Sequence, residues 1–419
     1  MRLKRNNLFT CLSRTCEYSS PASCGEGGVI SFKSAYPLLT RSLRVAVVHD
    51  WLVVNGGAER TLARMLECFP QAEVFTLVDF LPPEERRFLG DRPVHTSFLQ
   101  RLPAARKHYR QLLPLMPVAI ESFDLSRFDL VISSSFCVAK GVLSGPDQRH
   151  VSYVHSPMRY AWDLQHQYLR EHGLEKGVRG FLTRKLLYNM RMWDFRTANG
   201  VDAFISNSHF IARRVWKIYR RESAVIHPPV DTEFFQPADG GRDDYYLTAS
   251  RLVPYKCTRL IVDAFSQLPD RRLVVIGDGP EFERLKALAG PNVQLLGYQP
   301  SSVLRQYMQR ARAFIFAAQE DFGIVPVEAQ ACGTPVIAFG KGGVTESVVE
   351  GKSGVFFPEQ SADSLLDAIE QFEHRMTRFS AAEIRTNALR FSAERFKQQF
   401  RAYVEEQVKQ PARAERAVG

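Results

Sequence analysis

Hydrophobic residues in this chain form short uninterrupted runs that alternate with stretches of helical periodicity. The first run, 44–50, reads Arg-Val-Ala-Val-Val-His-Asp, and a continuous apolar run of this kind is typical of a strand buried in a parallel sheet. Further strands are expected at 74–77, 130–133, 150–154 and 203–206, with helices at about 58–68 and 180–193. This alternation predicts a Rossmann-like α/β domain over residues 44–226.

A second series of the same kind follows a segment rich in proline and glycine. That segment, 227–241, contains two adjacent prolines and two adjacent glycines, and we interpret it as a hinge or linker. Beyond it, strands are expected at 245–249, 272–276, 293–296, 313–316 and 335–338, with helices at 258–267, 281–289, 302–310 and 326–332 and from about 361. The series predicts a second Rossmann-like domain at 242–395, followed by a C-terminal helix and tail at 396–419. Repeated strand–helix units imply parallel sheets covered on both faces, here in two domains that face a cleft.

Residues 1–43 differ from the rest of the chain in composition. They begin with cations at positions 2, 4 and 5, contain a short apolar patch at 8–12 and continue into a stretch with Ser and Gly. The patch is shorter than the about 7 to 15 apolar residues of a signal-peptide core, so we predict a poorly ordered extension, with a targeting segment as the alternative. No apolar run reaches the roughly 20 residues that span a bilayer, and the seven cysteines follow no metal-site or disulfide spacing. We expect a cytoplasmic protein.

The chain carries 55 Lys and Arg against 45 Asp and Glu, a formal charge of +10. Cations gather without acids in two clusters, Arg101, Arg106, Lys107 and Arg110, and Arg213, Arg214, Lys217, Arg220 and Arg221. Such clusters attract nucleic acid, anionic lipid or phosphorylated substrates, although a solvated helix face has the same composition. Apolar residues accompany the first cluster, namely Phe98, Leu99, Leu102, Leu112, Leu113, Leu115 and Met116. We therefore predict reversible contact of this segment with anionic bilayers, with burial in the domain core as the alternative.

The strongest chemical signal follows the expected strand at 313–316. From Glu320 to Glu328 the sequence reads Glu-Asp-Phe-Gly-Ile-Val-Pro-Val-Glu, with a proline suited to the first turn of a helix. In an open α/β sheet, ligands bind beyond the carboxyl ends of the strands. Carboxylates placed there can accept hydrogen bonds from sugar hydroxyls, while the N–H groups of residues 322–325 point toward an anion. The alternative is a capping acid followed by a solvated helix acid.

Two further motifs also follow expected strands. Arg251 and Lys256 come after the strand at 245–249 and can converge on a diphosphate, Arg through its planar fork and Lys as a point charge. A solvated basic turn is the alternative. Gly56 and Gly57 follow the first strand, where glycines let the backbone approach a ligand and the next helix offers its positive end to phosphate. The loop lacks the GxGxxG pattern, and a plain strand–helix turn is the alternative.

These motifs resemble the retaining glycosyltransferases of family 4, which have the GT-B fold. Glu320 and Glu328 match the family's E-x7-E signature, and the stretches 329–338 and 342–346 are also similar to it. The resemblance covers about 43–402 and implies that Glu328 holds the donor ribose, Glu320 contacts the hexose near its 3-hydroxyl, and the two cations neutralise the leaving diphosphate. The donor contacts that it implies are Gly56, Gly57, Arg251, Lys256, Tyr298, Phe322, Gly323, Ile324 and Glu328. The loop 297–299 would grip the nucleobase, largely through its backbone.

The segment after the strand at 150–154 carries His155, Arg159 and Tyr160. A lone histidine after a strand is more often structural, but the family has an active-site histidine here, so the resemblance implies that His155 contacts the transferred sugar. We place Arg159 and Tyr160 on the acceptor side. Cys257 departs from the family, which usually has glycine at that position. The stretches 109–117 and 153–162 resemble a subgroup that contains bacterial mannosyltransferases of surface-polysaccharide assembly.

Together with these motifs, the resemblance implies a retaining hexosyltransferase with Glu320, His155, Arg251 and Lys256 in catalysis. No DxD carboxylate pair occurs, so neither a metal nor another cofactor is expected. The expected donor is GDP-mannose and the expected acceptor a glycan or lipid-linked saccharide, in the cytoplasm or at the inner face of the plasma membrane. The rivals are a sugar-nucleotide epimerase of the same fold and a nucleic-acid-binding protein. The second rival is weak, because the aromatics do not interleave with the cations as a stacking platform requires.

Overall fold

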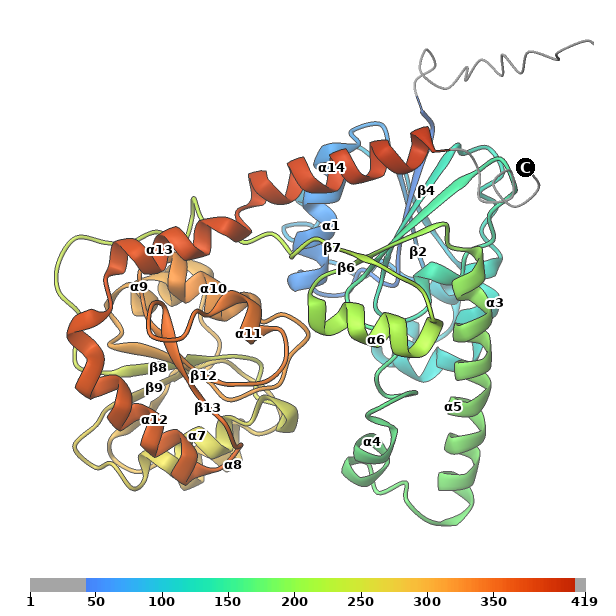
Figure 1. Ribbon diagram of the computed structural model, residues 1–419. Coiled ribbons are helices and arrows are strands. Elements are labelled where there is room, and N and C mark those ends of the chain that lie inside the picture. The colour runs from blue at the N-terminus through green and yellow to red at the C-terminus, as the bar shows by residue number, and fades with distance from the viewer. Residues whose placement is uncertain (1–42, 411–419) are drawn as a thin grey trace, which may run out of the picture. The chain divides into compact units, whose positions relative to one another are not determined.

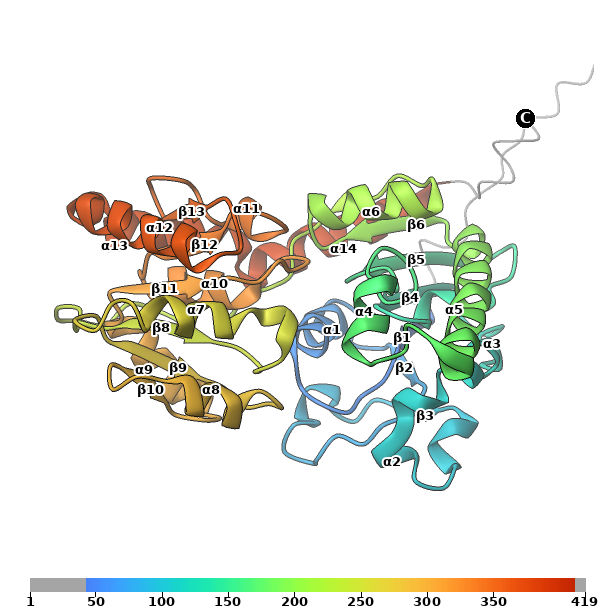
Figure 2. The ribbon, with the colours of Figure 1, turned by 90° about the horizontal axis from the view of Figure 1, so that it is seen from below.

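The computed structural model describes residues 43–410, which contain two β-sheets whose strands all pair in parallel (Figure 1). The first sheet has seven strands in the order β3-β2-β1-β4-β5-β6-β7, and the second has six in the order β10-β9-β8-β11-β12-β13. Figure 2 shows the strands of the second sheet in this order. The expectation for residues 1–43 falls, apart from Leu43, outside the described residues, as do positions 411–419.

The first sheet and its helices come mainly from the N-terminal half of the described chain. Its strands are β1 (Val45–His49), β2 (Glu73–Thr76), β3 (Val94–Thr96), β4 (Leu130–Ser135), β5 (Arg149–Val154), β6 (Ala203–Ser206) and β7 (Ala224–Val225). The helices among them are α1 (Gly57–Cys68), α2 (Ala105–His108), α3 (Met116–Glu121), α4 (Gln165–Glu171), α5 (Gly177–Thr197) and α6 (His209–Tyr219). The sequence pattern predicted each of these strands except β3 and β7.

The second sheet begins after the segment interpreted as a hinge. Its strands are β8 (Tyr246–Ala249), β9 (Leu273–Ile276), β10 (Val293–Leu295), β11 (Ala313–Phe316), β12 (Val336–Phe339) and β13 (Gly354–Phe357). Its helices are α7 (Thr258–Phe265), α8 (Phe282–Leu288), α9 (Ser301–Arg310), α10 (Ile324–Ala331), α11 (Val344–Ser347), α12 (Ala362–Arg375) and α13 (Ala381–Ala388), and α14 (Ala393–Lys409) ends the described chain.

Both sheets are buried on both faces, which explains why their strands are apolar without interruption. In β1, Val45 and Val47 belong to one core cluster, whereas Ala46 and Val48 belong to the cluster on the opposite face. The strand β11 divides its side chains between two clusters in the same way. Because successive side chains of a strand point to opposite faces, each face needs its own layer of helices.

The C-terminal helix α14 belongs to the core of the first sheet. Phe396, Phe400 and Val404 are buried in one cluster with Val45 and Tyr153, and Figure 1 shows α14 beside α1. The rings of Phe396 and Phe400 stack with their centroids 5.4 Å apart. The chain thus returns from the second sheet to complete the first. The core of the first sheet therefore extends beyond residues 44–226.

The structure corrects the expectation for the apolar residues beside the first basic cluster. Leu99 and Met116 are buried, with 1% and 2% of their surface exposed. Three further members of the set, Leu102, Leu112 and Leu113, pack against the same core. These five side chains cover one face of the first sheet, as the core alternative expects, whereas Phe98 and Leu115 are 42% and 43% exposed. No helix within residues 43–410 is long and apolar enough to cross a membrane.

Candidate active site

The segment from Glu320 to Glu328 lies at the carboxyl end of β11 and enters α10. Gly323 stands at the start of α10 with a φ of 85°, in the left-handed region that favours glycine. The loop at 342–343 packs on the backbone of this segment, and the Gly343 N–H donates to the Glu320 carbonyl oxygen over 2.8 Å. A Cβ atom on Gly343 would lie 2.2 Å from the Asp321 carbonyl oxygen. Only glycine fits there, which accounts for the adjacent glycines of the downstream motif.

Lys256 and Glu320 meet in an ion pair between Lys256 Nζ and Glu320 Oε1. Lys256 ends a short 3₁₀ turn, Pro254–Lys256, in the connection from β8 to α7. Cys257 follows with a φ of 54°, so the backbone keeps the left-handed conformation that glycine would adopt more easily. The structure therefore brings together two of the predicted catalytic residues from different loops.

Arg251 lies at the carboxyl end of β8 and its side chain is exposed. Within the described part of the chain, that side chain has no hydrogen bond or ion pair. A guanidinium in this position remains available for an anionic ligand.

Glu328 pairs with an arginine that the sequence did not indicate. Arg60, in α1, donates from Nη1 to Glu328 Oε1 over 2.8 Å, and only 3% of the Glu328 surface is exposed. Burial raises the pKa of Glu328, while the charge and hydrogen bond of Arg60 act in the opposite direction. The adjacent glycine loop packs closely against the start of α10. A Cβ atom added to Gly57 would lie only 2.9 Å from Ile324 Cδ1. The predicted glycine loop and the start of α10 are therefore in contact.

A cavity of about 430 Å³ lies beside the Arg60–Glu328 pair. Residues of α1 and α10 line it together with the segment after β7, and its walls include Asn55, Arg60, Ser301, Ile324 and Glu328. Two of the predicted donor contacts, Ile324 and Glu328, therefore border an open volume.

His155 lies directly after β5 in a chain of polar contacts. Its Nε2 atom is 2.8 Å from Ser134 Oγ, which is 3.1 Å from His49 Nδ1. The other ring nitrogen of His49 lies 3.5 Å from the buried Glu59 Oε1. Burial, together with the nearby His49, lowers the pKa of His155 to about 3. The imidazole of His155 is therefore neutral at physiological pH.

Arg159 contacts the segment after β11 through Asp321, another residue that the sequence analysis missed. Arg159 Nη2 and Arg214 Nη1 donate to the two Asp321 carboxylate oxygens over 2.7 and 3.2 Å. Ser208 Oγ donates to the Asp321 carbonyl oxygen over 2.6 Å. Burial raises the pKa of Asp321, and the two arginines counteract that effect. Arg214 belongs to the second predicted basic cluster, so that cluster is partly structural.

Tyr160 and Tyr298 are not in contact with these carboxylates. The Tyr160 hydroxyl lies 3.0 Å from Cys137 Sγ, and its ring packs against the core of the first sheet. Tyr298 lies after β10, with 77% of its surface exposed. The predicted roles of both residues stay predictions.

Glu346 makes a separate contact between the two parts of the described chain. Its carboxylate accepts hydrogen bonds from the N–H groups of His209 and Phe210, at 2.8 and 2.9 Å, at the start of α6. His227 Nε2 lies 3.0 Å from the same carboxylate. Burial acts to raise the pKa of Glu346, but these hydrogen bonds outweigh it and hold that pKa below its usual value.

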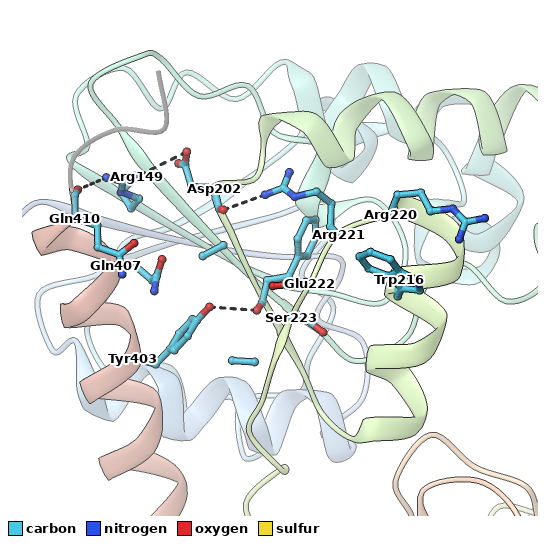
Figure 3. Close-up of a pocket in the computed structure, with 13 residues that line it drawn as sticks. Arg149, Asp202, Trp216, Arg220, Arg221, Glu222, Ser223, Tyr403, Gln407 and Gln410 are labelled. Carbon is cyan, nitrogen blue, oxygen red and sulfur yellow. Dashed lines mark hydrogen bonds and ion pairs between the residues drawn. The ribbon is translucent and has the colours of Figure 1, made fainter. Parts of the chain in front are cut away.

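A larger cavity, of about 550 Å³, lies away from all of these residues (Figure 3). Arg149, Asp202 and Ser223 of its wall stand near the amino ends of β5, β6 and β7, opposite the strand ends where α/β sheets bind ligands. Two of its cations also have partners: Arg149 lies 3.6 Å from Asp202, and Arg221 donates to the Val201 carbonyl oxygen over 2.8 Å. We therefore do not place the active site there. No cluster of three or more His, Cys, Asp or Glu side chains within residues 43–410 is arranged to hold a metal ion.

Two sequence families match the two halves of the described chain. Residues 55–234 match the family described as "Glycosyltransferase Family 4", and residues 229–388 match the family described as "Glycosyl transferases group 1". The region around each sheet is therefore similar to one of these two glycosyltransferase families. Two α/β domains with parallel sheets, each similar to a glycosyltransferase family, define the GT-B fold. The sequence predicted this fold.

Two similar proteins are themselves named as glycosyltransferases. A D-inositol 3-phosphate glycosyltransferase of Mycobacteroides abscessus is 31% identical over a region covering 40% of this chain and 43% of that protein. A GDP-mannose-dependent alpha-(1-6)-phosphatidylinositol monomannoside mannosyltransferase of Mycolicibacterium smegmatis is 29% identical, with coverage of 42% and 53%. The chain thus spans about half or less of the length of these relatives. The crystal structure of Anabaena Alr3699/HepE in complex with UDP and glucose superposes with a TM-score of 0.63 at 19% identity, over 87% of this chain and 100% of that one.

The contacts of Glu346 predict a specific pH dependence of stability. Replacing Glu346 with Gln should lower the free energy of unfolding by about 1 kcal/mol at neutral pH, because the start of α6 loses a charged acceptor. Since the folded-state pKa is lowered, this stabilisation is present above the usual glutamate pKa and is lost as pH falls through the lowered value.

Urea unfolding at a series of pH values measures the difference between wild type and variant, with the exposed Glu370→Gln as the matched control. The difference should be largest at neutral pH and vanish in acid. A difference that grows as the pH falls would contradict the role assigned to Glu346.

Proposed function

We propose that this protein is a retaining glycosyltransferase that moves a hexose from a nucleotide sugar onto a saccharide or lipid-linked acceptor without a metal ion. One observation carries the proposal: Lys256 and Glu320 meet at the carboxyl ends of neighbouring strands, in a chain whose two regions match glycosyltransferase families. The carboxyl ends of parallel strands are the usual place for a ligand in this class of sheet.

In the proposed reaction, the diphosphate leaves with charge building on its oxygens. Lys256 and Arg251 stabilise that charge, with help from the N–H groups at the start of α10. Lys256 is paired with Glu320 in the structure. On donor binding, the ammonium turns to the phosphate and the Glu320 carboxylate accepts a hydrogen bond from the hexose. Each group therefore exchanges one partner for another without becoming a buried, unpaired charge.

Glu328 is proposed to accept hydrogen bonds from the donor ribose. Its ion pair with Arg60 orients this buried carboxylate and opposes the rise in its pKa that burial causes. Gly56 and Gly57 are proposed to leave space for a phosphate or sugar, because a side chain in this loop would fill part of that space. At Gly57 the backbone already lies so near Ile324 that an added Cβ atom would be 2.9 Å from its Cδ1.

His155 is proposed to contact the transferred sugar as a neutral imidazole. Its Nε2 atom is engaged with Ser134, which leaves Nδ1 for a sugar hydroxyl. Arg159 is proposed on the acceptor side, although its guanidinium is held by Asp321, so we assign it to orienting the segment after β11 as well.

GDP-mannose is the proposed donor. The mannosyltransferase relative is named as GDP-mannose-dependent, and the sequence resembles a mannosyltransferase subgroup. A UDP-linked hexose is the competing donor, since the Anabaena structure of the same fold holds UDP and glucose. The base would lie near Gly297, where a φ of 68° shapes the loop.

A sugar-nucleotide epimerase is the rival activity, because it would use the same donor contacts. Such an enzyme converts the nucleotide sugar without any acceptor. Comparing product formation with and without a panel of saccharide and lipid-linked acceptors separates the two activities, and acceptor-independent conversion would reject the transferase proposal.

Replacing Lys256 or Arg251 with Ala should lower turnover by about 100-fold, because each change removes charge aimed at the leaving group. Transfer of the sugar from the donor to an acceptor, measured in the presence of excess EDTA, tests this together with metal independence. Arg272→Ala is the matched control, since this exposed arginine precedes β9 at the opposite end of the same sheet. Unchanged turnover in both variants, or activity that returns only with added Mn²⁺ or Mg²⁺, would contradict the proposed mechanism.

The donor assignment predicts that GDP stabilises the fold more than UDP or ADP. GDP at 100 times its dissociation constant should raise the free energy of unfolding by about 2.7 kcal/mol, and UDP or ADP at the same concentration should raise it less. Thermal unfolding with each nucleotide measures this, and Glu328→Gln should reduce the shift because the ribose loses a charged acceptor. A shift with UDP or ADP but not with GDP would overturn the guanine assignment and leave the transferase proposal in place.

A further inference from the structure

Helix α5 exposes a row of large apolar side chains along most of its length. The exposed members are Val178, Phe181, Leu182, Tyr188, Met192 and Phe195. We define the outer stripe as Phe181, Tyr188, Met192 and Phe195, which are between 46% and 67% exposed. At 3.6 residues per turn these four side chains fall within about 60° of one another and extend over roughly 20 Å of the helix. A contiguous apolar surface of this kind marks an interaction site more often than scattered exposed residues do.

The outer stripe lies on the side of α5 that the fold does not use. Leu187, Met190 and Thr197 are the buried residues of the opposite face, where Leu187 and Met190 join the core of the first sheet. Figure 1 shows that the first turns of α5 extend with α4 beyond the strands. The core therefore needs only one side of α5, and packing within the described chain does not explain the apolar residues of the other side.

Cations accompany the outer stripe, and among them Arg196 is paired with Glu121 at the end of α3. Between 176 and 197 the cations are Lys176, Arg179, Arg184, Lys185, Arg191 and Arg196. The acid in this stretch, Asp194, is fully buried and pairs with Lys140 at 2.7 Å. Arg184 and Lys185 flank the stripe on its two sides, and Lys185 Nζ lies 5.3 Å from the centre of the Tyr188 ring. This face is therefore both apolar and strongly basic.

We propose that the outer face of α5 docks on an anionic lipid bilayer. Apolar and aromatic side chains with flanking Lys and Arg are the combination that lies in the interface of a membrane with negative surface charge. A second copy of the chain is a poorer occupant, because symmetric packing of the stripe would bring the same cations against one another. The proposal assigns membrane contact to α5 instead of the segment around the first basic cluster, most of whose apolar side chains lie in the core.

Two variants of the full chain test the two halves of the surface. The stripe variant carries Phe181→Gln, Tyr188→Gln and Met192→Gln, and the charge variant carries Arg184→Gln and Lys185→Gln, the two cations that flank the stripe. The matched control replaces three exposed apolar side chains outside α5, with Phe98→Gln, Leu115→Gln and Val118→Gln. Circular dichroism and melting temperature confirm that each variant folds, and the charge variant leaves the apolar stripe intact if the stripe variant is unstable.

Sedimentation with vesicles of phosphatidylcholine, alone and mixed with phosphatidylglycerol, gives the binding constants. The protein should bind the anionic vesicles and release them as salt is raised. Both α5 variants should lose at least about ten-fold in affinity, while the control keeps the affinity of the unmodified protein. Unchanged binding by the α5 variants, or equal binding to neutral and anionic vesicles at every salt concentration, would overturn the proposal.

Self-association provides the remaining outcome. Analytical ultracentrifugation without lipid should find the same oligomeric state for the unmodified protein and the stripe variant. If the unmodified protein is a dimer and the stripe variant a monomer, a second copy covers the stripe and the membrane proposal is wrong. Vesicle binding requires no nucleotide sugar, so this test fails or succeeds independently of the proposed transfer reaction.

Discussion

A carboxylate removed from water must find a cation or hydrogen-bond donors, and the segment after β11 contains three such carboxylates within nine residues. Glu320, Asp321 and Glu328 are each paired with cations from elsewhere in the chain. The partners, in the same order, are Lys256, then Arg159 with Arg214, and then Arg60. These ion pairs set how the loop after β8, the segment after β5, and helices α1 and α6 lie against the start of α10.

The same pairs give the site its chemical character. Burial raises the pKa of Glu328, and the charge and hydrogen bond of Arg60 oppose that effect. Lys256 and Glu320 neutralise each other until a ligand that carries both phosphate and hydroxyl groups can replace each partner. Arg251 has no partner within the described residues and adds positive charge at the same strand ends. The proposed donor supplies both phosphate and hydroxyl groups, and so offers new partners for these groups, whereas a neutral sugar does not.

Local sequence patterns predicted the local parts of this arrangement. The uninterrupted apolar runs predicted most strands, because a strand that is buried on both faces is apolar at every position. The polar loops directly after those strands were placed correctly at the carboxyl ends of the sheets. Three short edge strands, β3, β7 and β13, were missed, since none stands out as a long apolar run. The roles of the individual site residues remain predictions.

The sequence pattern could not predict contacts between residues that lie far apart along the chain. Arg60 and Glu328 are 268 positions apart, and nothing in the amphipathic pattern of α1 distinguishes Arg60 from a solvated arginine. Asp321 stands between two more conspicuous features, Glu320 and a Phe-Gly turn, and only the fold shows its two arginines. Helix α14 carries apolar residues that specify burial but not the sheet on which they are buried. The apolar residues around the first basic cluster were misplaced for the related reason that composition alone does not separate core from surface.

The central claim is that the carboxyl ends of β8 and β11 form a donor site organised by Lys256, Arg251, Glu320 and Glu328. A crystal structure of the protein with bound nucleoside diphosphate tests this claim most directly. The account predicts that the diphosphate oxygens lie within hydrogen-bond distance of Lys256 and Arg251 and that the ribose hydroxyls contact Glu328. A nucleotide bound in the cavity beside Arg149, or a diphosphate that touches neither cation, would contradict it.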